Sequence, residues 1–191
     1  MRCYSCAKLS LNILCKACQN TLFRSTITTK TIGSLEVISF YKYSTIESLL
    51  LTKHTPQGYR IYKALATITV KPFIQTFIEE DNRMVYIIGI DEYVQDTYSH
   101  VALLTHAMKT KYSRPLHASL MSQNRVHYAG KDLQFRLDHP RAFTYTGKSH
   151  IDVILVDDII TTGITLQEAQ KVLIQHNVNV LFALTLADVE E

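Results

Sequence analysis

The segment that decides the fold is "ILVDDIITTGIT", which runs from Ile154 to Thr165. It opens with an apolar run, continues into two adjacent acids, Asp157 and Asp158, and then passes through two threonines to a glycine. An apolar run of this kind is typical of a strand that is buried on both faces of a parallel sheet. Ligands of open α/β sheets bind beyond the carboxyl ends of the strands. We therefore expect the strand to end at Val156 and the two acids to lie just past its carboxyl end.

The residues that follow the acids favour binding of a phosphate. The expected contacts are Thr161, Thr162, Gly163 and Thr165, at the start of a helix predicted from about Thr165 to His176. Backbone N–H groups, hydroxyls and the positive end of the helix dipole would converge there, and glycine permits a close approach or a positive φ. Two adjacent carboxylates repel each other, and sugar hydroxyls or a divalent cation would stabilise them. A ribose 5-phosphate fits both parts of this segment, with its hydroxyls on the two acids and its phosphate at the Thr-Gly turn. The alternative is a solvated turn with one threonine as a helix cap, which leaves the acid pair unexplained.

The rest of the chain predicts an α/β fold with an open parallel sheet and helices on its faces. Four strands are expected, at residues 35–40, 85–90, 151–156 and 178–186, with a brief fifth at 118–120. One helix is expected at residues 98–111. A second is expected to open at a capping box formed by Ser44 and Glu47, and a third from about Tyr59, with a break or kink at Pro72. Residues 123–146 are polar and predict a long loop.

All four cysteines lie in the first eighteen residues, as two CxxC pairs: Cys3, Cys6, Cys15 and Cys18. Two such pairs suit a tetrahedral zinc site, since each short turn presents two thiolates to one ion. Such a closed site folds the segment and performs no chemistry. A disulfide framework or a redox CxxC pair are the alternatives, and a reducing cytosol disfavours the first. We divide the chain into a zinc-binding segment with its linker, residues 1–30, and one larger domain, residues 31–191.

Charge is unevenly distributed along the chain. The overall net charge is +3, but residues 1–72 carry +8 and the rest carry −5. This asymmetry predicts an anionic partner for the first third, or a solvated basic surface. We find no apolar run long enough to span a bilayer and no secretory signal, so we expect a cytoplasmic protein.

The segment Val153 to Thr165 resembles the binding signature for phosphoribosyl pyrophosphate (PRPP) of type I phosphoribosyltransferases. Together with the amino-terminal double CxxC, it resembles the ComF family of competence proteins. The resemblance implies that Asp157 and Asp158 contact the ribose hydroxyls, that the Thr-Gly turn binds the 5-phosphate, and that Mg²⁺ accompanies PRPP. It also implies a mobile loop that closes over pyrophosphate, with the candidate contacts Arg125, Lys131, Arg136 and Arg141. Each of these residues is equally typical of an ordinary solvated charge.

Two parts of the family pattern are missing. The family commonly has a Pro-Val-Pro segment where this chain has residues 88–92, "IGIDE", and an Arg-Gly-Phe-Asn signature where it has residues 96–100, "DTYSH". The chain also ends at Glu191, soon after the last strand, so we expect no carboxyl-terminal hood to read a nucleobase.

Three functions remain open at this point. The favoured one is a competence protein for natural transformation, which binds PRPP and handles incoming single-stranded DNA in the cytoplasm, with components of the DNA uptake machinery at the inner membrane as further partners. Phosphates of the DNA would meet basic residues of the first third, and bases would stack on tyrosines such as Tyr41, Tyr43 or Tyr59. The expected phosphate contacts are Lys8, Lys16, Arg24, Lys30, Lys42 and Lys53. The first alternative is a catalytically active nucleobase phosphoribosyltransferase of purine or pyrimidine salvage. The second is a regulator of nucleotide metabolism that binds PRPP and a protein partner.

Overall fold

A computed structural model describes residues 1–22, 27–80, 83–90, 98–124 and 133–189 of the chain. Its main sheet has six strands, β1 to β4, β7 and β8, and all of them except β1 run parallel to their neighbours. The spatial order is β1 (Thr28–Ile32), β2 (Leu35–Lys42), β8 (Asn179–Asp188), β7 (Asp152–Ile160), β3 (Val85–Gly89) and β4 (Ser113–Pro115). The predicted fold class, an α/β protein with an open and mostly parallel sheet, is confirmed.

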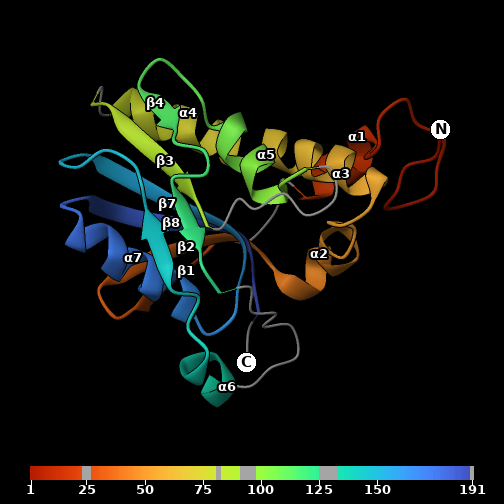
Figure 1. Ribbon diagram of the computed structural model, residues 1–191. Helices are drawn as coiled ribbons and strands as arrows, with labels where there is room; N and C mark the ends of the chain where they lie inside the picture. Colours follow the sequence, from red (N-terminus) through yellow and green to blue (C-terminus); the bar gives the residue numbers. More distant parts are fainter. Residues whose placement is uncertain (23–26, 81–82, 91–97, 125–132, 190–191) are drawn as a thin grey trace.

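Helices cover both faces of this sheet. The structure contains α1 (Lys16–Leu22), α2 (Tyr43–Leu50), α3 (Pro56–Ile68), α4 (Val70–Glu80), α5 (His100–Ala107), α6 (Leu133–Asp138) and α7 (Ile164–Gln175). Figure 1 shows α7 on one side of the sheet and α4 and α5 on the other. A second, two-stranded sheet of β5 (Leu120–Ser122) and β6 (Phe143–Tyr145) lies on the α7 side, where Leu120 and Phe143 join the core.

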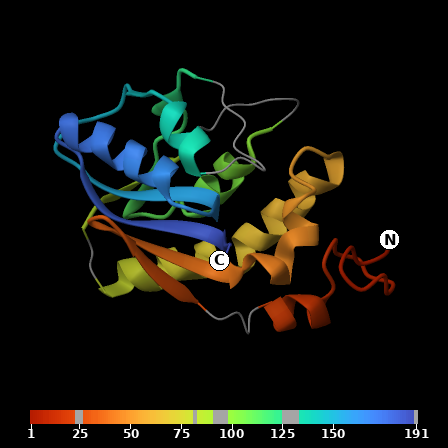
Figure 2. The same cartoon turned by 90° about the horizontal axis from the view of Figure 1, so that it is seen from below.

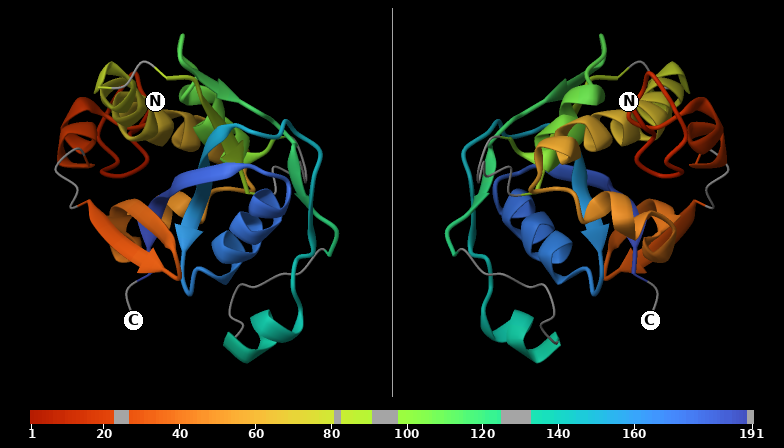
Figure 3. Two further views of the ribbon diagram at one scale, coloured as in Figure 1. Left: turned by 90° about the vertical axis from the view of Figure 1, so that its left-hand side faces the viewer. Right: turned by 90° about the vertical axis from the view of Figure 1, so that its right-hand side faces the viewer.

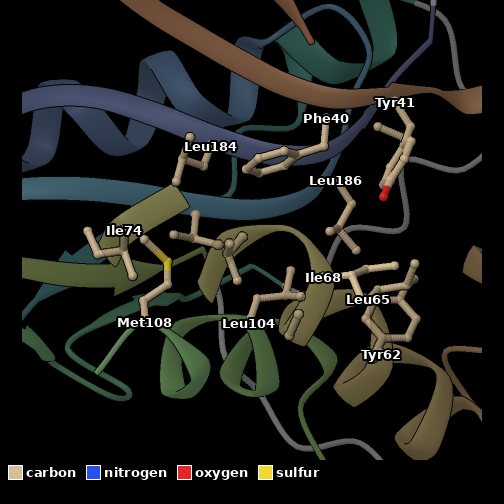
Figure 4. Packing of buried hydrophobic residues seen from close by; sticks show 14 of the residues in the cluster. Phe40, Tyr41, Tyr62, Leu65, Ile68, Ile74, Leu104, Met108, Leu184 and Leu186 are labelled. Atoms are coloured by element: carbon tan, nitrogen blue, oxygen red, sulfur yellow. The ribbon is translucent and has the colours of Figure 1, made fainter. Parts of the chain in front are cut away.

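Each face has its own core. Helices α2 to α5 pack on one face through large apolar side chains such as Leu65, Ile74 and Leu104, all fully buried (Figure 4). On the other face, α7 packs Leu166 and Leu173 against the strands. Side chains of successive strand residues alternate between faces. Accordingly Ile154 and Val156 join the first core, whereas Val153 and Leu155 join the second.

The amino-terminal cysteine segment lies beside α3 and away from the sheet (Figures 1 and 2). The first strand of the main sheet, β1, begins at Thr28, three residues before the start of the larger domain that the sequence suggested. At the far end of the molecule, α6 projects from the body (Figures 1 and 3). In the described ranges, every helix falls short of the length and apolar character that a bilayer span requires.

Several local predictions were wrong. Ser44 lies inside α2, which begins at Tyr43 with no side-chain cap, so the capping box is not formed. Helix α3 begins earlier than predicted, because Thr55 caps it by accepting a hydrogen bond from the N–H of Gly58. The break between α3 and α4 falls at Thr69, and Pro72 sits in the first turn of α4, where a missing N–H costs nothing.

The second half contains corrections of the same kind. The long loop predicted at residues 123–146 includes α6 and β6, and the brief strand falls at 120–122 in place of 118–120. Strand β4 was not predicted, because its three residues give no usable pattern. Most important, β7 does not end at Val156 but runs on to Ile160, so that both acids lie within a strand.

Candidate functional site

The two acids lie where β7 outruns its neighbour β3. The pairing of β3 with β7 ends with Gly89 opposite Val156, and the N–H of Ile90 donates to the carbonyl of Val156. On its other side β7 continues to pair with β8, with Asp157 opposite Thr185. The acids therefore lie beyond the carboxyl end of β3, as expected for a site in an open sheet.

Asp158 is buried and surrounded by donors. Its Oδ2 lies 3.1 Å from Nζ of Lys53, 3.2 Å from Nε2 of His100 and 3.3 Å from the hydroxyl of Tyr62. Burial would raise the pKa of Asp158, but the charges and hydrogen bonds of His100 and Lys53 outweigh burial and hold the pKa well below its ordinary value. Asp158 is therefore ionised at neutral pH.

The three donors come from three different elements. Lys53 lies in the turn between α2 and α3, Tyr62 in α3, and His100 at the first position of α5, whose cap is Ser99. Burial lowers the pKa of Lys53, but the charge of Asp158 outweighs burial and raises the pKa above its ordinary value. The ammonium group therefore stays charged beside the carboxylate.

Asp157 has different surroundings. It is only half-buried, and the alternation of strand residues directs it to the face that α7 covers. Its Oδ1 accepts a hydrogen bond of 2.8 Å from the backbone N–H of Asp158. Burial, followed by the charge of Asp158, raises the pKa of Asp157 to about 8, although Arg141 and Lys53 oppose the rise. The protein thus holds one charged and one largely protonated acid side by side.

The turn after β7 has the conformation that its glycine suggested. Gly163 has φ 76°, in the left-handed region, and it caps α7. The positive φ favours glycine at this position, and a side chain here would also force the end of the Ile32 side chain in β1 to move. Thr161, Thr162 and Thr165 are half-buried around it. The Oγ1 of Thr162 is shielded from solvent and has no hydrogen-bond partner. Buried hydroxyls are normally paired, so this one indicates a missing partner.

Of the four loop residues expected to contact pyrophosphate, the structure describes one in full. Arg125 and Lys131 lie outside the described residues, and so does the side chain of Arg136. The backbone N–H of Arg141 and that of Ala142 donate to the carboxylate of Glu168 in α7, at 3.1 and 2.7 Å. Glu168 thereby fixes the backbone of Arg141 against α7, and the charge of the Arg141 guanidinium lowers the pKa of Asp157.

The four cysteines form a cluster that suits one metal ion. All four sulfur atoms lie within 4.8 Å of one another, with 3.8 Å between Cys3 and Cys18 and 3.7 Å between Cys6 and Cys15. Four thiolates at zinc–sulfur distances of about 2.3 Å in a tetrahedron are about 3.8 Å apart, so these two pairs already have the separation that zinc requires.

Backbone N–H groups stabilise one thiolate of this cluster, that of Cys3. Burial raises the pKa of the Cys3 thiol, but N–H groups of Cys15 and Cys6 outweigh burial and lower the pKa to about 6. The N–H of Cys15 donates directly to the sulfur of Cys3, at 3.2 Å. Ala7, with φ 59°, closes the first knuckle in the left-handed region, and its N–H donates to the carbonyl of Cys3.

The basic residues of the first third divide into two groups. Lys30 forms an ion pair of 2.6 Å with the buried Asp188, and Lys53 pairs with Asp158, so both charges are used inside the chain. Arg24 lies outside the described residues. The remaining expected contacts, all exposed, are Lys8, Lys16 and Lys42. Among the tyrosines considered for stacking, Tyr41 is 1% exposed and packs in the core, so it cannot meet a base (Figure 4).

A groove of about 510 Å³ runs between the cysteine segment and α3. Its polar lining consists of Asn12 and Gln19 on one wall and, on α3, Tyr59, Arg60, Lys63 and Thr67. Arg60 and Lys63 are separated by one helical turn, and the lining contains no acid among the described residues. Tyr59 keeps 42% of its surface exposed. The groove therefore combines positive charge, amide groups and an exposed ring.

The sequence did not predict the partners of Asp158 or the groove. Tyr62 and His100 have no local signal, because they meet Asp158 only through the packing of α3 and α5. Lys53 was predicted as a DNA contact. Arg60 and Lys63 were counted in the basic first third, and their spacing of three on a helix was the one signal that placed them on a common face.

Several solved structures are similar to this chain. They include an adenine phosphoribosyltransferase, with 13% identity over 90% of this chain and 89% of that chain and a TM-score of 0.45, and the adenine phosphoribosyltransferase of Saccharomyces cerevisiae, with 14% identity over 90% and 88% and a TM-score of 0.45. A hypoxanthine phosphoribosyltransferase from Staphylococcus aureus has 17% identity over 66% of this chain and a TM-score of 0.41, and the chain covers 64% of that enzyme. No protein-family model and no curated protein matched the sequence. Identities this low say nothing about a substrate.

Proposed function

We propose that the chain binds a ribose 5-phosphate group, as part of PRPP, where β7 leads into α7. The observation that carries the proposal is the succession of three features from the last part of β7 to the start of α7: the half-buried acid Asp157, the unpartnered hydroxyl of Thr162 and the left-handed Gly163. The acids suit sugar hydroxyls, and the start of α7 suits a phosphate. A phosphate oxygen in the turn would supply the partner that Thr162 lacks.

Binding of ribose 5-phosphate and of PRPP, each with and without Mg²⁺, is measured by isothermal titration calorimetry. Thr162→Val should weaken the affinity for ribose 5-phosphate about tenfold, the effect of one charge-assisted hydrogen bond. Thr31→Val, an exposed threonine in β1, is the matched control and should leave affinity unchanged. Absence of binding by the wild-type protein at millimolar ligand would disprove the proposal.

We also propose that the basic first third binds single-stranded DNA along the groove beside α3. The support is electrostatic: the net charge is +8 over residues 1–72, Arg60 and Lys63 line the groove, and Lys8 and Lys16 are exposed in the cysteine segment that supplies its other wall. Tyr59 offers a partly exposed ring for stacking. A zinc ion on the four cysteines would hold the segment that forms one wall.

The DNA proposal is tested by fluorescence anisotropy of a labelled oligonucleotide at several salt concentrations. Each phosphate contact that is lost should reduce the slope of log affinity against log salt by about 0.7. Arg60→Glu with Lys63→Glu should therefore reduce the slope by at least that amount per residue. Lys171→Glu, on the exposed face of α7, is the matched control. Binding that does not depend on salt would contradict the proposal.

The cellular role follows from the resemblance to the ComF family and is part of the same proposal. We propose a cytoplasmic protein that handles incoming single-stranded DNA during natural transformation, in contact with the uptake machinery at the inner membrane. The test is complementation of a deletion strain with the Asp157→Asn variant, scored as transformation frequency. Incubation with PRPP, Mg²⁺ and each common nucleobase tests the alternative, because rapid formation of nucleotide and pyrophosphate would make the protein a phosphoribosyltransferase.

A further inference from the structure

The two adjacent acids are equal in the sequence but not in the structure. Asp158 is 6% exposed, and one of its oxygens accepts from a lysine, a histidine and a tyrosine, at 3.1, 3.2 and 3.3 Å. A carboxylate oxygen has about two lone-pair directions, so three donors saturate it. Asp157 is half-buried and points to the opposite face of the sheet.

The donors of Asp158 could not be released cheaply for a ligand. Tyr62 is fully buried, and its other acceptor, the carbonyl of Leu50, lies at 3.3 Å. The ring of His100 packs edge-on against the rings of Tyr62 and His54, with centroids 5.4 and 6.1 Å away. If a sugar hydroxyl replaced these donors, a charged group and a buried phenol would lose their partner, which costs more than one neutral hydrogen bond returns.

The turn that carries Lys53 is itself fixed. The hydroxyl of Tyr98 donates to the carbonyl of Lys53 at 2.6 Å, and Gly58 packs so closely against Thr52 that a side chain there would overlap the carbonyl of Thr52. Lys53 is 105 residues away from Asp158 in the sequence. Its ion pair therefore joins the first third of the chain to the end of β7 through a rigid turn.

We infer that the two acids have separate roles, in which Asp158 is a structural residue that fastens the α2–α3 turn and α5 to β7, and Asp157 is the main acceptor of the sugar hydroxyls. The inference rests on the proposed ribose-phosphate site and assigns the roles within it. Lys53, Tyr62 and His100 act through Asp158, because together they fasten the α2–α3 turn and α5 to the end of β7. Lys53 is then a part of this cluster and not a contact for DNA.

The test compares single variants of the full-length protein in two measurements, affinity for ribose 5-phosphate by calorimetry and Tm by differential scanning. Asp157→Asn should weaken affinity at least tenfold at pH 9, where Asp157 is ionised and its charge strengthens the hydrogen bonds from the sugar, without lowering Tm. Asp158→Asn should lower Tm by about 5 °C or more, because it strands Lys53 and His100, and should weaken affinity less than threefold. Asp152→Asn, at the other end of β7 and paired with Asn179, is the matched control for an acid in the same strand.

Lys53 provides a second route if Asp158→Asn does not fold. Lys53→Met should lower Tm, and Lys53→Arg, which keeps the ion pair, should restore most of it, with affinity for ribose 5-phosphate changed less than threefold in both. Equal loss of affinity in the two acid variants, or a tenfold loss in Lys53→Met at unchanged Tm, would overturn the inference while the ribose-phosphate site stands. A wild-type protein that does not bind ribose 5-phosphate would overturn the site and the inference together.

Discussion

Replacing Asp157 with asparagine should stabilise the protein at neutral pH. In the folded chain, burial and the charge of Asp158 raise the pKa of Asp157 from 3.8 to about 8. Between these two values the folded protein binds a proton that the unfolded chain has released, so stability falls as the pH rises. The pKa of Asp158 is held low, so its contribution is lost only in strong acid. Asp157 therefore dominates the pH dependence of this pair between pH 5 and pH 8.

The magnitude follows from the shift. One proton corresponds to about 1.4 kcal/mol per pH unit, so the raised pKa costs at most about 4 kcal/mol at pH 7. Because Asp157 keeps partial contact with solvent, we halve this value and expect a gain of about 2 kcal/mol in Asp157→Asn. For a chain of this size, this gain raises Tm by about 4 to 8 °C. Asparagine is nearly isosteric and can still accept the hydrogen bond from the N–H of Asp158.

The assay is urea unfolding at pH 5, 6, 7 and 8, followed by circular dichroism. Between pH 5 and pH 7 the free energy of unfolding of the wild type should fall by about 1 to 2 kcal/mol relative to that of Asp157→Asn. The plot of unfolding free energy against pH should be flatter for the variant. Asp152→Asn controls for removal of an acid from the same strand and should retain the wild-type slope. Equal slopes in wild type and Asp157→Asn, or a variant that is less stable at pH 7, would refute the reasoning.

Three further predictions concern other parts of the chain. The purified protein should contain about one zinc ion per chain by metal analysis. The Cys6→Ser variant should lose this ion and show a lower helical signal from the amino-terminal segment in circular dichroism. A zinc stoichiometry near zero in reducing buffer would count against the site. Gly163→Ala should lower the free energy of unfolding in urea by about 1 to 3 kcal/mol, because alanine is strained at φ 76° and its methyl group overlaps Ile32. A loss below about 0.5 kcal/mol would mean that the turn relaxes freely. Glu168→Ala should lower the free energy of unfolding by about 1 to 3 kcal/mol, because it leaves two backbone N–H groups without their acceptor. Glu168→Gln should retain part of this stability in the same assay.

The sequence allowed the sheet to be predicted because its strands are either continuous apolar runs or alternate clearly. Strand β3 and the helix that ends at Gln175 were placed within a few residues for this reason. The extension of β7 through Asp157 and Asp158 was not predicted, because charged residues argue against a strand unless a neighbouring strand supports them. Here β8 is long enough to pair with β7 to its end.

The site was predicted in its local part only. Residues 157–165 are close in the sequence, so their chemistry could be interpreted together. The cluster on Asp158 depends on residues 58, 96 and 105 positions away, and no spacing in the sequence brings them together. The groove likewise arises from two segments that meet only in the folded chain, Asn12 to Gln19 and the exposed side of α3.

One wall of that groove has an unusual origin. Asn12, Ile13 and Gln19 all belong to the stretch that the four cysteines enclose or flank, whereas the opposite wall is an ordinary helix. Oxidants that convert thiolates to disulfides or sulfenic acids would eject a metal from the cluster and release the first wall, with the sheet and α3 left in place. With a metal on the four cysteines, the shape of the groove would depend on the redox state of the compartment in which the protein works.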